Sequence, residues 1–265
     1  MSASRGTALV GSIAAVATMA VACAPEPLNL GDSPEIVWWT DHETGDTSDW
    51  FAGGAGSTAT RVSGQLDIVP SPARSGSHAL RSVVTSTGST SRSSAFAERT
   101  GILPVNAYYS AWYQVPEIAT PSPYWLCFKF RSRRVASDPA TDVEGWDVDF
   151  VPGEGGAMKF ALYSHADKAN EPPVAMPAVP VGRWFQIEAF LRAIDDDTGQ
   201  LIVWVDGVKI FDVQARATMP SAFVQWQVGS IVEGITPATV SLFVDDAAIS
   251  TRRLGPDYPV FWRGR

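Results

Sequence analysis

The stretch Gln200–Val213, Gln-Leu-Ile-Val-Trp-Val-Asp-Gly-Val-Lys-Ile-Phe-Asp-Val, indicates the fold class most directly. Two runs rich in Val and Ile flank Asp206-Gly207. An Asp-Gly pair in this setting is typical of a two-residue type I′ turn, whose central residues both need positive φ. The stretch therefore predicts a β-hairpin with strands at Gln200–Val205 and Val208–Val213.

Similar short segments continue on both sides of this hairpin, separated by clusters of Gly, Pro, Asn and Asp, and no long amphipathic helical pattern interrupts them. Many short strands with turns between them predict an all-β fold with two antiparallel sheets. Without an internal repeat, we expect one domain over residues 36–253, followed by a C-terminal tail at 254–265. The further predicted strands are Ile36–Thr40, Thr58–Val62, Leu66–Val69, His78–Val84, Ser93–Thr100, Ala107–Val115, Tyr124–Arg131, Trp146–Val151, Ala157–His165, Trp184–Leu191, Phe223–Ile231 and Val240–Ser250.

Three consecutive predicted strands, Tyr124–Arg131, Trp146–Val151 and Ala157–His165, each alternate between an apolar and a polar face. If they pair as a meander, their polar faces form one surface. Cys127 falls on this surface, where it has no cationic partner to activate it and is expected to be a small filler. The other residues expected there are Trp125, Lys129, Arg131, Asp147, Asp149, Lys159, Tyr163 and His165.

Composition excludes some functions. The chain has 265 residues, of which 45% are hydrophobic, so it can bury a substantial core. Its formal net charge is -8, and the one basic cluster is the short run Arg131–Arg134. Nucleic acids require a basic footprint, so no nucleic-acid partner is expected. Ten Trp residues supply aromatic surface for a core or for stacking on a ligand.

The N-terminus is typical of an exported protein. Residues 1–22 combine Arg5 with an uncharged Ala- and Val-rich segment, as signal peptides do. The end of this segment, Ala20-Val21-Ala22-Cys23, resembles the lipobox of bacterial lipoproteins, which implies acylation of Cys23. The alternative is an ordinary cleavage site with Cys23 incidental. Residues 23–35 are rich in Pro and polar residues and suit a tether. We therefore expect a protein anchored to the cell envelope only through lipid.

Several motifs recur in an order that resembles carbohydrate-associated jelly rolls of the concanavalin A-like lectin/glucanase superfamily, near its heparin-lyase-like and laminin-G-like branches. The resemblance covers Asp41 to Ser250, and it implies a jelly roll with a polysaccharide or glycan partner. The motifs are Asp41-His42-Glu43-Thr44-Gly45-Asp46 with Trp50, Ser75-Gly76-Ser77-His78-Ala79-Leu80, Tyr108–Pro116, Gly182-Arg183-Trp184 with Trp204-Val205-Asp206-Gly207, and Val244–Ile249.

The resemblance leaves three functions open. Jelly-roll lyases of the alginate-lyase type carry Gln-x-His on a central strand, where this chain has Phe128-Lys129-Phe130-Arg131. Our first expectation is therefore a polysaccharide-binding domain. The alternatives are a lyase that cleaves a uronic-acid polymer by β-elimination, and a non-catalytic adhesion or structural surface protein. We expect a monomer without an organic cofactor.

The polar surface carries the residues for either sugar function. In a lyase, Arg131 or Lys129 would neutralise the uronate carboxylate, and Tyr163 or His165 would act as base and acid. The alternative for these residues is cross-strand pairing of Asp with Lys on a wet sheet face. The residues expected to bind carbohydrate are Trp125, Lys129, Arg131, Asp147, Asp149, Tyr163 and His165.

Acidic residues near both ends of the domain suggest a structural Ca²⁺ site. The resemblance places the first and last strands side by side, which would bring together Asp41, Glu43, Asp46, Asp245 and Asp246 as oxygen ligands. The alternative is a solvated turn beside a hydrogen-bonded strand end. A second acidic stretch, Asp195-Asp196-Asp197-Thr198-Gly199, is either a metal loop or, as its spacing favours, a solvated hairpin loop.

Overall fold

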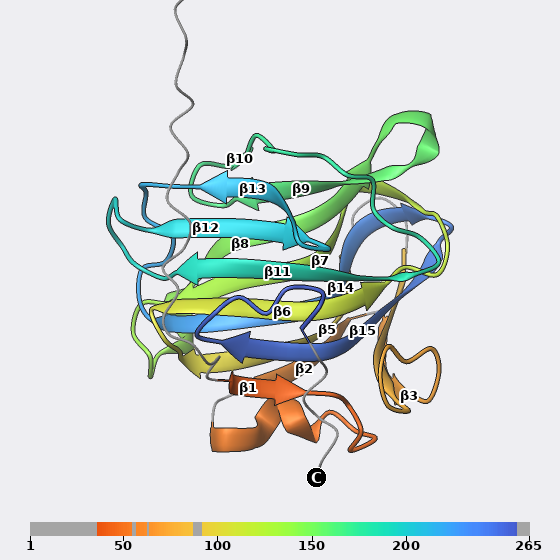
Figure 1. Cartoon of the computed structure of the whole chain (residues 1–265), viewed down its shortest axis with the longest axis horizontal. Coiled ribbons are helices and arrows are strands. Elements are labelled where there is room, and N and C mark those ends of the chain that lie inside the picture. Colours follow the sequence, from red (N-terminus) through yellow and green to blue (C-terminus); the bar gives the residue numbers. More distant parts are fainter. Residues whose placement is uncertain (1–35, 55–56, 63, 87–91, 259–265) are drawn as a thin grey trace, which may run out of the picture.

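The computed structural model describes residues 36–54, 57–62, 64–86 and 92–258 and consists mainly of two layers of β-strands (Figure 1). All strand pairs are antiparallel. Sheet A contains, in spatial order, β13 (Val208–Val213), β12 (Gln200–Val205), β11 (Trp184–Arg192), β6 (Asn106–Gln114), β15 (Thr239–Ser250), β4 (Ala79–Thr85) and β3 (Gly64–Val69), with β1 (Ile36–Thr40) also paired to β15.

Sheet B forms the second layer and contains, in spatial order, β10 (Ala169–Asn170), β9 (Met158–Ser164), β8 (Asp142–Pro152), β7 (Thr120–Arg133), β14 (Phe223–Thr236), β5 (Ser93–Ile102) and β2 (Ser57–Val62). Three short 3-10 helices complete the described part of the chain: η1 (Ser48–Gly54), η2 (Pro139–Thr141) and η3 (Glu154–Gly156). Among the residues with a described position, no helix has the length and apolar character to cross a membrane.

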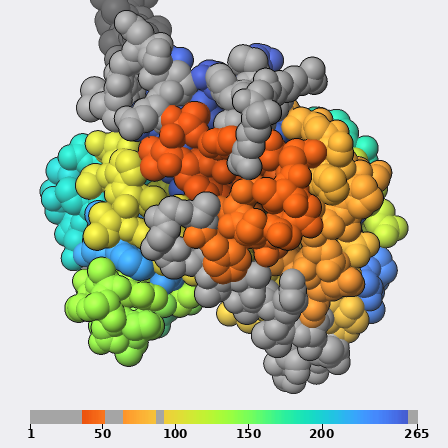
Figure 2. Space-filling view, turned by 90° about the horizontal axis from the view of Figure 1, so that it is seen from below, coloured from red at the N-terminus to blue at the C-terminus, as the bar shows by residue number. Residues whose placement is uncertain are grey.

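The core lies between the sheets and is rich in aromatic side chains. Trp50 on η1 is 1% exposed, and its ring lies 4.8 Å from Trp38 and 5.9 Å from Trp226. Tyr109 of sheet A contacts Trp226 of sheet B at 5.5 Å, which joins the two layers. Residues 36–54, in red and orange, form much of the surface at this end of the sandwich (Figure 2). The first-strand motif therefore closes one end of the core.

Each predicted strand has a counterpart in the structure, with ends that differ by a few residues. In the Asp-Gly hairpin, Asp206 and Gly207 have φ of 47° and 79°, and Val205 pairs with Val208. These are the positive φ values that the turn requires, so the hairpin is confirmed. The sequence analysis missed β10, because two exposed residues carry no alternating pattern.

A bulge in β7 makes one part of the predicted alternation wrong. Trp125 pairs with Phe150 and Leu126 with Asp149, but the next pair joins Phe128 to Val148, so Cys127 is an extra residue. A one-residue slip moves side chains to the opposite face. Trp125 and Cys127 consequently lie in the core, and Leu126 lies on the polar face in their place.

Trp125 therefore cannot serve as the sugar-stacking ring that its predicted position suggested. It is 0% exposed, packs edge-on against Phe150 at 5.5 Å, and donates from Nε1 to Ser230 Oγ at 3.0 Å. Cys127 is unpaired and buried, as a small filler would be, and burial raises the pKa of its thiol well above the ordinary value. A thiol of this kind is a poor nucleophile.

The described chain also continues past the predicted domain end at Arg253. The backbone N–H groups of Leu254 and Gly255 donate to the buried carboxylate of Glu188 at 2.6 and 3.2 Å. Arg253 donates to the same carboxylate at 3.1 Å. The first residues of the predicted tail therefore pack on sheet A.

Candidate functional site

A row of polar residues crosses sheet B on the face opposite the core. Directly opposed residues of antiparallel strands point to the same face, so cross-strand pairs identify this row. It confirms that the three alternating strands pair as a meander with their polar faces together. The row consists of Glu98, Gln227, Lys129, Asp147, Tyr163 and Asn170, each paired with the next.

Lys129 lies near the centre of the row and is 2% exposed. Its Nζ lies 2.5 Å from Glu144 Oε2 and 3.0 Å from Asp147 Oδ1. Partial burial acts to raise the pKa of Glu144, but the charge and hydrogen bond of Lys129 outweigh it and the net pKa is lowered. A buried ammonium held by two carboxylates has no lone pair to offer as a base, so Lys129 positions and neutralises its neighbours.

Asp147 holds His165 in one orientation. The distance from His165 Nε2 to Asp147 Oδ2 is 2.8 Å, and an ionised carboxylate can only accept a hydrogen bond, so the ring proton lies on Nε2. The lone pair is then on Nδ1, for which the described part of the chain provides no partner. The Tyr163 ring packs edge-on against His165 at 5.1 Å. Both side chains are partly exposed, so the His165 ring offers a base nitrogen and the neighbouring Tyr163 ring offers a hydroxyl.

Asp149 lies two residues beyond Asp147 on the same face of β8 and is 6% exposed. Burial raises the pKa of its carboxyl well above the usual value, and the charge of Asp147 adds to this, against smaller lowering effects of Lys129 and Arg92. The two neighbouring carboxyl groups, of Asp147 and Asp149, thus differ in their electrostatic environment. Asp147 is paired with the Lys129 ammonium and accepts from the neutral His165 ring, whereas the environment of Asp149 favours the neutral acid.

A hollow of about 440 Å³ is lined by Asp147, Asp149, Tyr163 and His165, together with other residues. A smaller hollow of about 180 Å³ shares Arg92 with it and is lined by Lys129, Arg131 and Glu144 among others. We call the two hollows together the polar groove. The larger hollow is lined by Arg92, Pro123, Tyr124, Asp147, Asp149, Val151, Tyr163, His165 and Asn170.

The sequence analysis missed Arg92, Tyr124 and Asn170. Arg92 lies outside the strands, just before β5, where no periodic pattern assigns a face. Tyr124 begins a predicted strand, so its aromatic ring was the one available signal. Burial raises the pKa of Tyr124 to about 12, so its hydroxyl stays protonated and can donate. Asn170 belongs to β10, which was not predicted. Of the residues expected to bind carbohydrate, only Trp125 is absent from the groove face.

The acidic residues of the calcium hypothesis lie elsewhere, at the junction of β1 and β15, whose predicted pairing is confirmed. Asp245 Oδ2 accepts from the backbone N–H groups of Arg74 and Ser75 at 2.8 and 3.2 Å, and Asp246 Oδ2 accepts from Arg74 Nη1 at 2.8 Å. Arg74 thus supplies the cation beside this pair.

The remaining acids of this set have local partners. Glu43 accepts from the backbone N–H groups of Ser77 and His78, and exposed Asp46 accepts from that of Ser48. Asp41 accepts from the N–H of Glu43 at 3.2 Å. Across the described ranges, no group of three or more Asp, Glu, His or Cys residues is placed to hold a metal. Calcium binding stays a prediction.

A melting experiment tests calcium binding. If Ca²⁺ binds only the folded state, the melting temperature will rise with calcium concentration, by an amount set by RT ln(1 + [L]/Kd). Differential scanning calorimetry in chelator, in calcium and in magnesium measures this rise. The same melting temperature in all three solutions would contradict the hypothesis.

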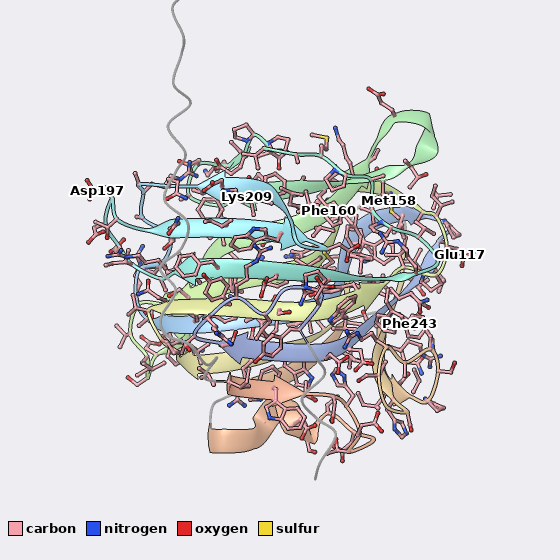
Figure 3. All side chains as sticks on the ribbon, in the orientation of Figure 1. Glu117, Met158, Phe160, Asp197, Lys209 and Phe243 are labelled. Atoms are coloured by element: carbon pink, nitrogen blue, oxygen red, sulfur yellow. The ribbon has the colours of Figure 1, made fainter. Side chains whose placement is uncertain are left out.

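The second acidic stretch lies at one end of the sandwich, where Asp197 is labelled in Figure 3. Asp196 Oδ1 accepts from the Thr198 N–H at 2.7 Å and from its hydroxyl at 2.6 Å. These hydrogen bonds lower the pKa of Asp196. This is the geometry of an exposed Asx turn, which agrees with a solvated hairpin loop.

Comparisons with known proteins identify the fold. No protein-family model and no curated protein matches the sequence. Among solved structures, an endo-beta-1,4-glucuronan lyase from the fungus Trichoderma reesei superimposes with a TM-score of 0.60 at 16% identity, covering 85% of this chain and 100% of that one. The alginate lyase Aly36B gives 0.58 at 13% identity, covering 84% and 98%. The alginate lyase vAL-1 from Chlorella virus gives 0.54 at 11%, covering 82% and 100%. The chain therefore has the concanavalin A-like jelly-roll fold.

Proposed function

We propose that this protein is a polysaccharide lyase that cleaves a uronic-acid polymer in the polar groove of sheet B. The observation that carries the proposal is the placement of His165, held by Asp147, beside Tyr163 on the wall of an open hollow. The names of the similar structures add support, since a glucuronan lyase and alginate lyases share the fold.

β-Elimination requires a base for the C5 proton, an acid for the leaving oxygen and a group that neutralises the uronate carboxylate. In this proposal His165 Nδ1 takes the C5 proton, and Asp147 stabilises the resulting imidazolium. The electron pair of the C5–H bond forms the C4=C5 double bond as the C4–O bond breaks. Tyr163 donates its hydroxyl proton to the leaving oxygen. Arg92 supplies positive charge at the hollow, and the Lys129 ammonium pairs with Asp147.

A second candidate is polysaccharide binding without cleavage, as the sequence first suggested. One observation favours it: the two cations that were expected to neutralise a uronate, Lys129 and Arg131, already form ion pairs with carboxylates of the protein. Lys129 is held by Glu144 and Asp147, and Arg131 Nε lies 3.3 Å from Glu144 Oε1. The same groove would then hold the polymer by aromatic and charged contacts alone.

A polysaccharide panel separates the two candidates. The folded domain is incubated with polyglucuronate, with alginate and with carboxyl-reduced forms of both, and the ultraviolet absorbance of the unsaturated uronate is followed. Growth of that absorbance with the acidic polymers alone would support the lyase. Retention on a polyglucuronate gel without absorbance growth would support binding, and neither signal with any glycan would contradict both.

We also propose that the protein is exported and lipid-anchored to the cell envelope. The support is the segment from Arg5 to Cys23, which lies outside the described residues. Cells that express the wild type should incorporate a labelled fatty acid into the protein, and Cys23→Ser should abolish the label. Equal labelling of both proteins would contradict the proposal.

A further inference from the structure

The carboxyl of Asp149 has one buried oxygen without a hydrogen-bond partner among the described residues. Its Oδ1 is fully buried, and none of the described residues forms a hydrogen bond with it. Leaving such an atom unpaired is unfavourable, and more so when it carries charge. The rest of the Asp149 side chain lines the larger hollow, where a ligand can reach it. The buried side of the carboxyl thus lacks a donor that would stabilise a negative charge.

The surroundings of Asp149 determine its protonation. On its own strand Asp147 lies 3.0 Å from Lys129 Nζ and 2.8 Å from His165 Nε2. A second negative charge two residues away, out of contact with water, is unfavourable. The titratable and charged groups on the groove side of Asp149 are Asp147 on β8, Lys129 and Tyr124 on β7, Tyr163 and His165 at β9, and Arg92 before β5. The Cys127 thiol approaches from the core side.

We propose that Asp149 is the uronate-recognition residue of the polar groove, and that as a neutral acid it donates its O–H to the carboxylate of the bound sugar. This inference rests on the proposed function and deepens it, because it names the group that meets the substrate's charge. An O–H···O⁻ hydrogen bond is charge-assisted and strong. An ionised Asp149 would instead repel the uronate, so binding depends on the proton.

The same contact places the reacting carbon. In a uronate, C5 is bonded directly to the carboxylate carbon. Because Asp149 and His165 line one hollow, a sugar held by its carboxylate at Asp149 keeps C5 within that hollow, beside the His165–Tyr163 pair. Withdrawal of charge from the carboxylate also makes the C5 proton more acidic. Asp149 would thereby contribute to both binding and elimination.

The pKa of Asp149 predicts how binding and stability change with pH. In the folded protein this pKa lies above its usual value of 3.8, mainly because of burial. Below 3.8 the carboxyl is neutral in both folded and unfolded chains. As the pH rises from there through the folded-state pKa, the unfolded chain ionises more readily, so the contribution of Asp149 to stability is lost. Uronate binding is lost over the upper part of the same range.

Affinity electrophoresis through a gel that carries polyglucuronate, repeated at several pH values, tests the inference. Wild-type retention should weaken by roughly tenfold as Asp149 ionises. Asp149→Asn keeps a donor of similar size but cannot ionise, so its retention should vary less with pH. Asp197→Asn makes the same substitution in an exposed loop and should show the pH dependence of the wild type. A gel carrying the carboxyl-reduced polymer should give no such pH dependence.

The outcomes distinguish this inference from the proposed function. Retention of the wild type that depends on pH no more than retention of Asp149→Asn would overturn the role of Asp149 and leave the lyase proposal intact. No retention of the wild type at any pH would overturn both. Thermal melting provides a second measurement, since the wild type should lose stability relative to Asp149→Asn as the pH rises. If the melting temperatures of the wild type and Asp149→Asn changed in parallel with pH, the claim that Asp149 is a neutral acid in the folded protein would be contradicted.

Discussion

Replacing His165 by Ala or Tyr163 by Phe is expected to reduce the rate of uronate-polymer cleavage by about 10²–10⁴-fold, the usual contribution of a general base or acid. His165→Ala removes the nitrogen whose partner ring atom lies 2.8 Å from Asp147. Tyr163→Phe removes only the hydroxyl and keeps the edge-on ring contact with residue 165. The rate of ultraviolet absorbance growth measures both losses.

The control for the base is His78→Ala. His78 is also partly exposed and lies 3.6 Å from a carboxylate, that of Glu43, but it stands outside the groove. It should keep the wild-type rate. Both groove variants should melt near the wild-type temperature, because neither side chain is fully buried. Unchanged cleavage in either variant would contradict the role assigned to that residue.

Lys129→Met is expected to destabilise the protein by about 3–5 kcal/mol, the cost of removing one partner of a buried ion pair. Lys129 is almost fully buried between Glu144 and Asp147, and Met retains much of its apolar volume. The substitution leaves the buried carboxylate of Asp147 without its counter-charge. Urea unfolding measures the difference in the free energy of unfolding.

Lys209→Met is the matched control, since it makes the same substitution in an ion pair that is more exposed. Lys209, labelled in Figure 3, lies 2.8 Å from Asp212, and its side chain is 30% exposed. Surface pairs contribute about 0–1 kcal/mol, so this change should be small. Adding Asp147→Asn to Lys129→Met should restore part of the lost stability. Equal effects of the two Lys substitutions would show that burial of the Lys129 cluster has no energetic consequence.

The features that the sequence by itself determined, the turn and the strand alternation, depend on the local geometry of the backbone. The Asp206-Gly207 turn is decided by φ values that few other residue pairs adopt, so two residues specify a hairpin. Alternation along Trp146–Val151 is equally local, because successive side chains on a strand point to opposite faces. Asp147 and Asp149 could thus be assigned to one polar face, and short connections made a meander of β7, β8 and β9 predictable.

The tertiary structure decided what depends on strands far apart in the sequence. The extra residue at Cys127 becomes a bulge only because β8 pairs on both sides of it, and this pairing carries Trp125 into the core. The raised pKa of Asp149 follows from burial and from the charge of Asp147, whose own partners Lys129 and His165 lie on other segments. Arg92 reaches the groove from outside the strands. Backbone periodicity places a side chain on a face, whereas solvent exclusion and neighbouring charges, which set its chemistry, arise only when the sheets assemble.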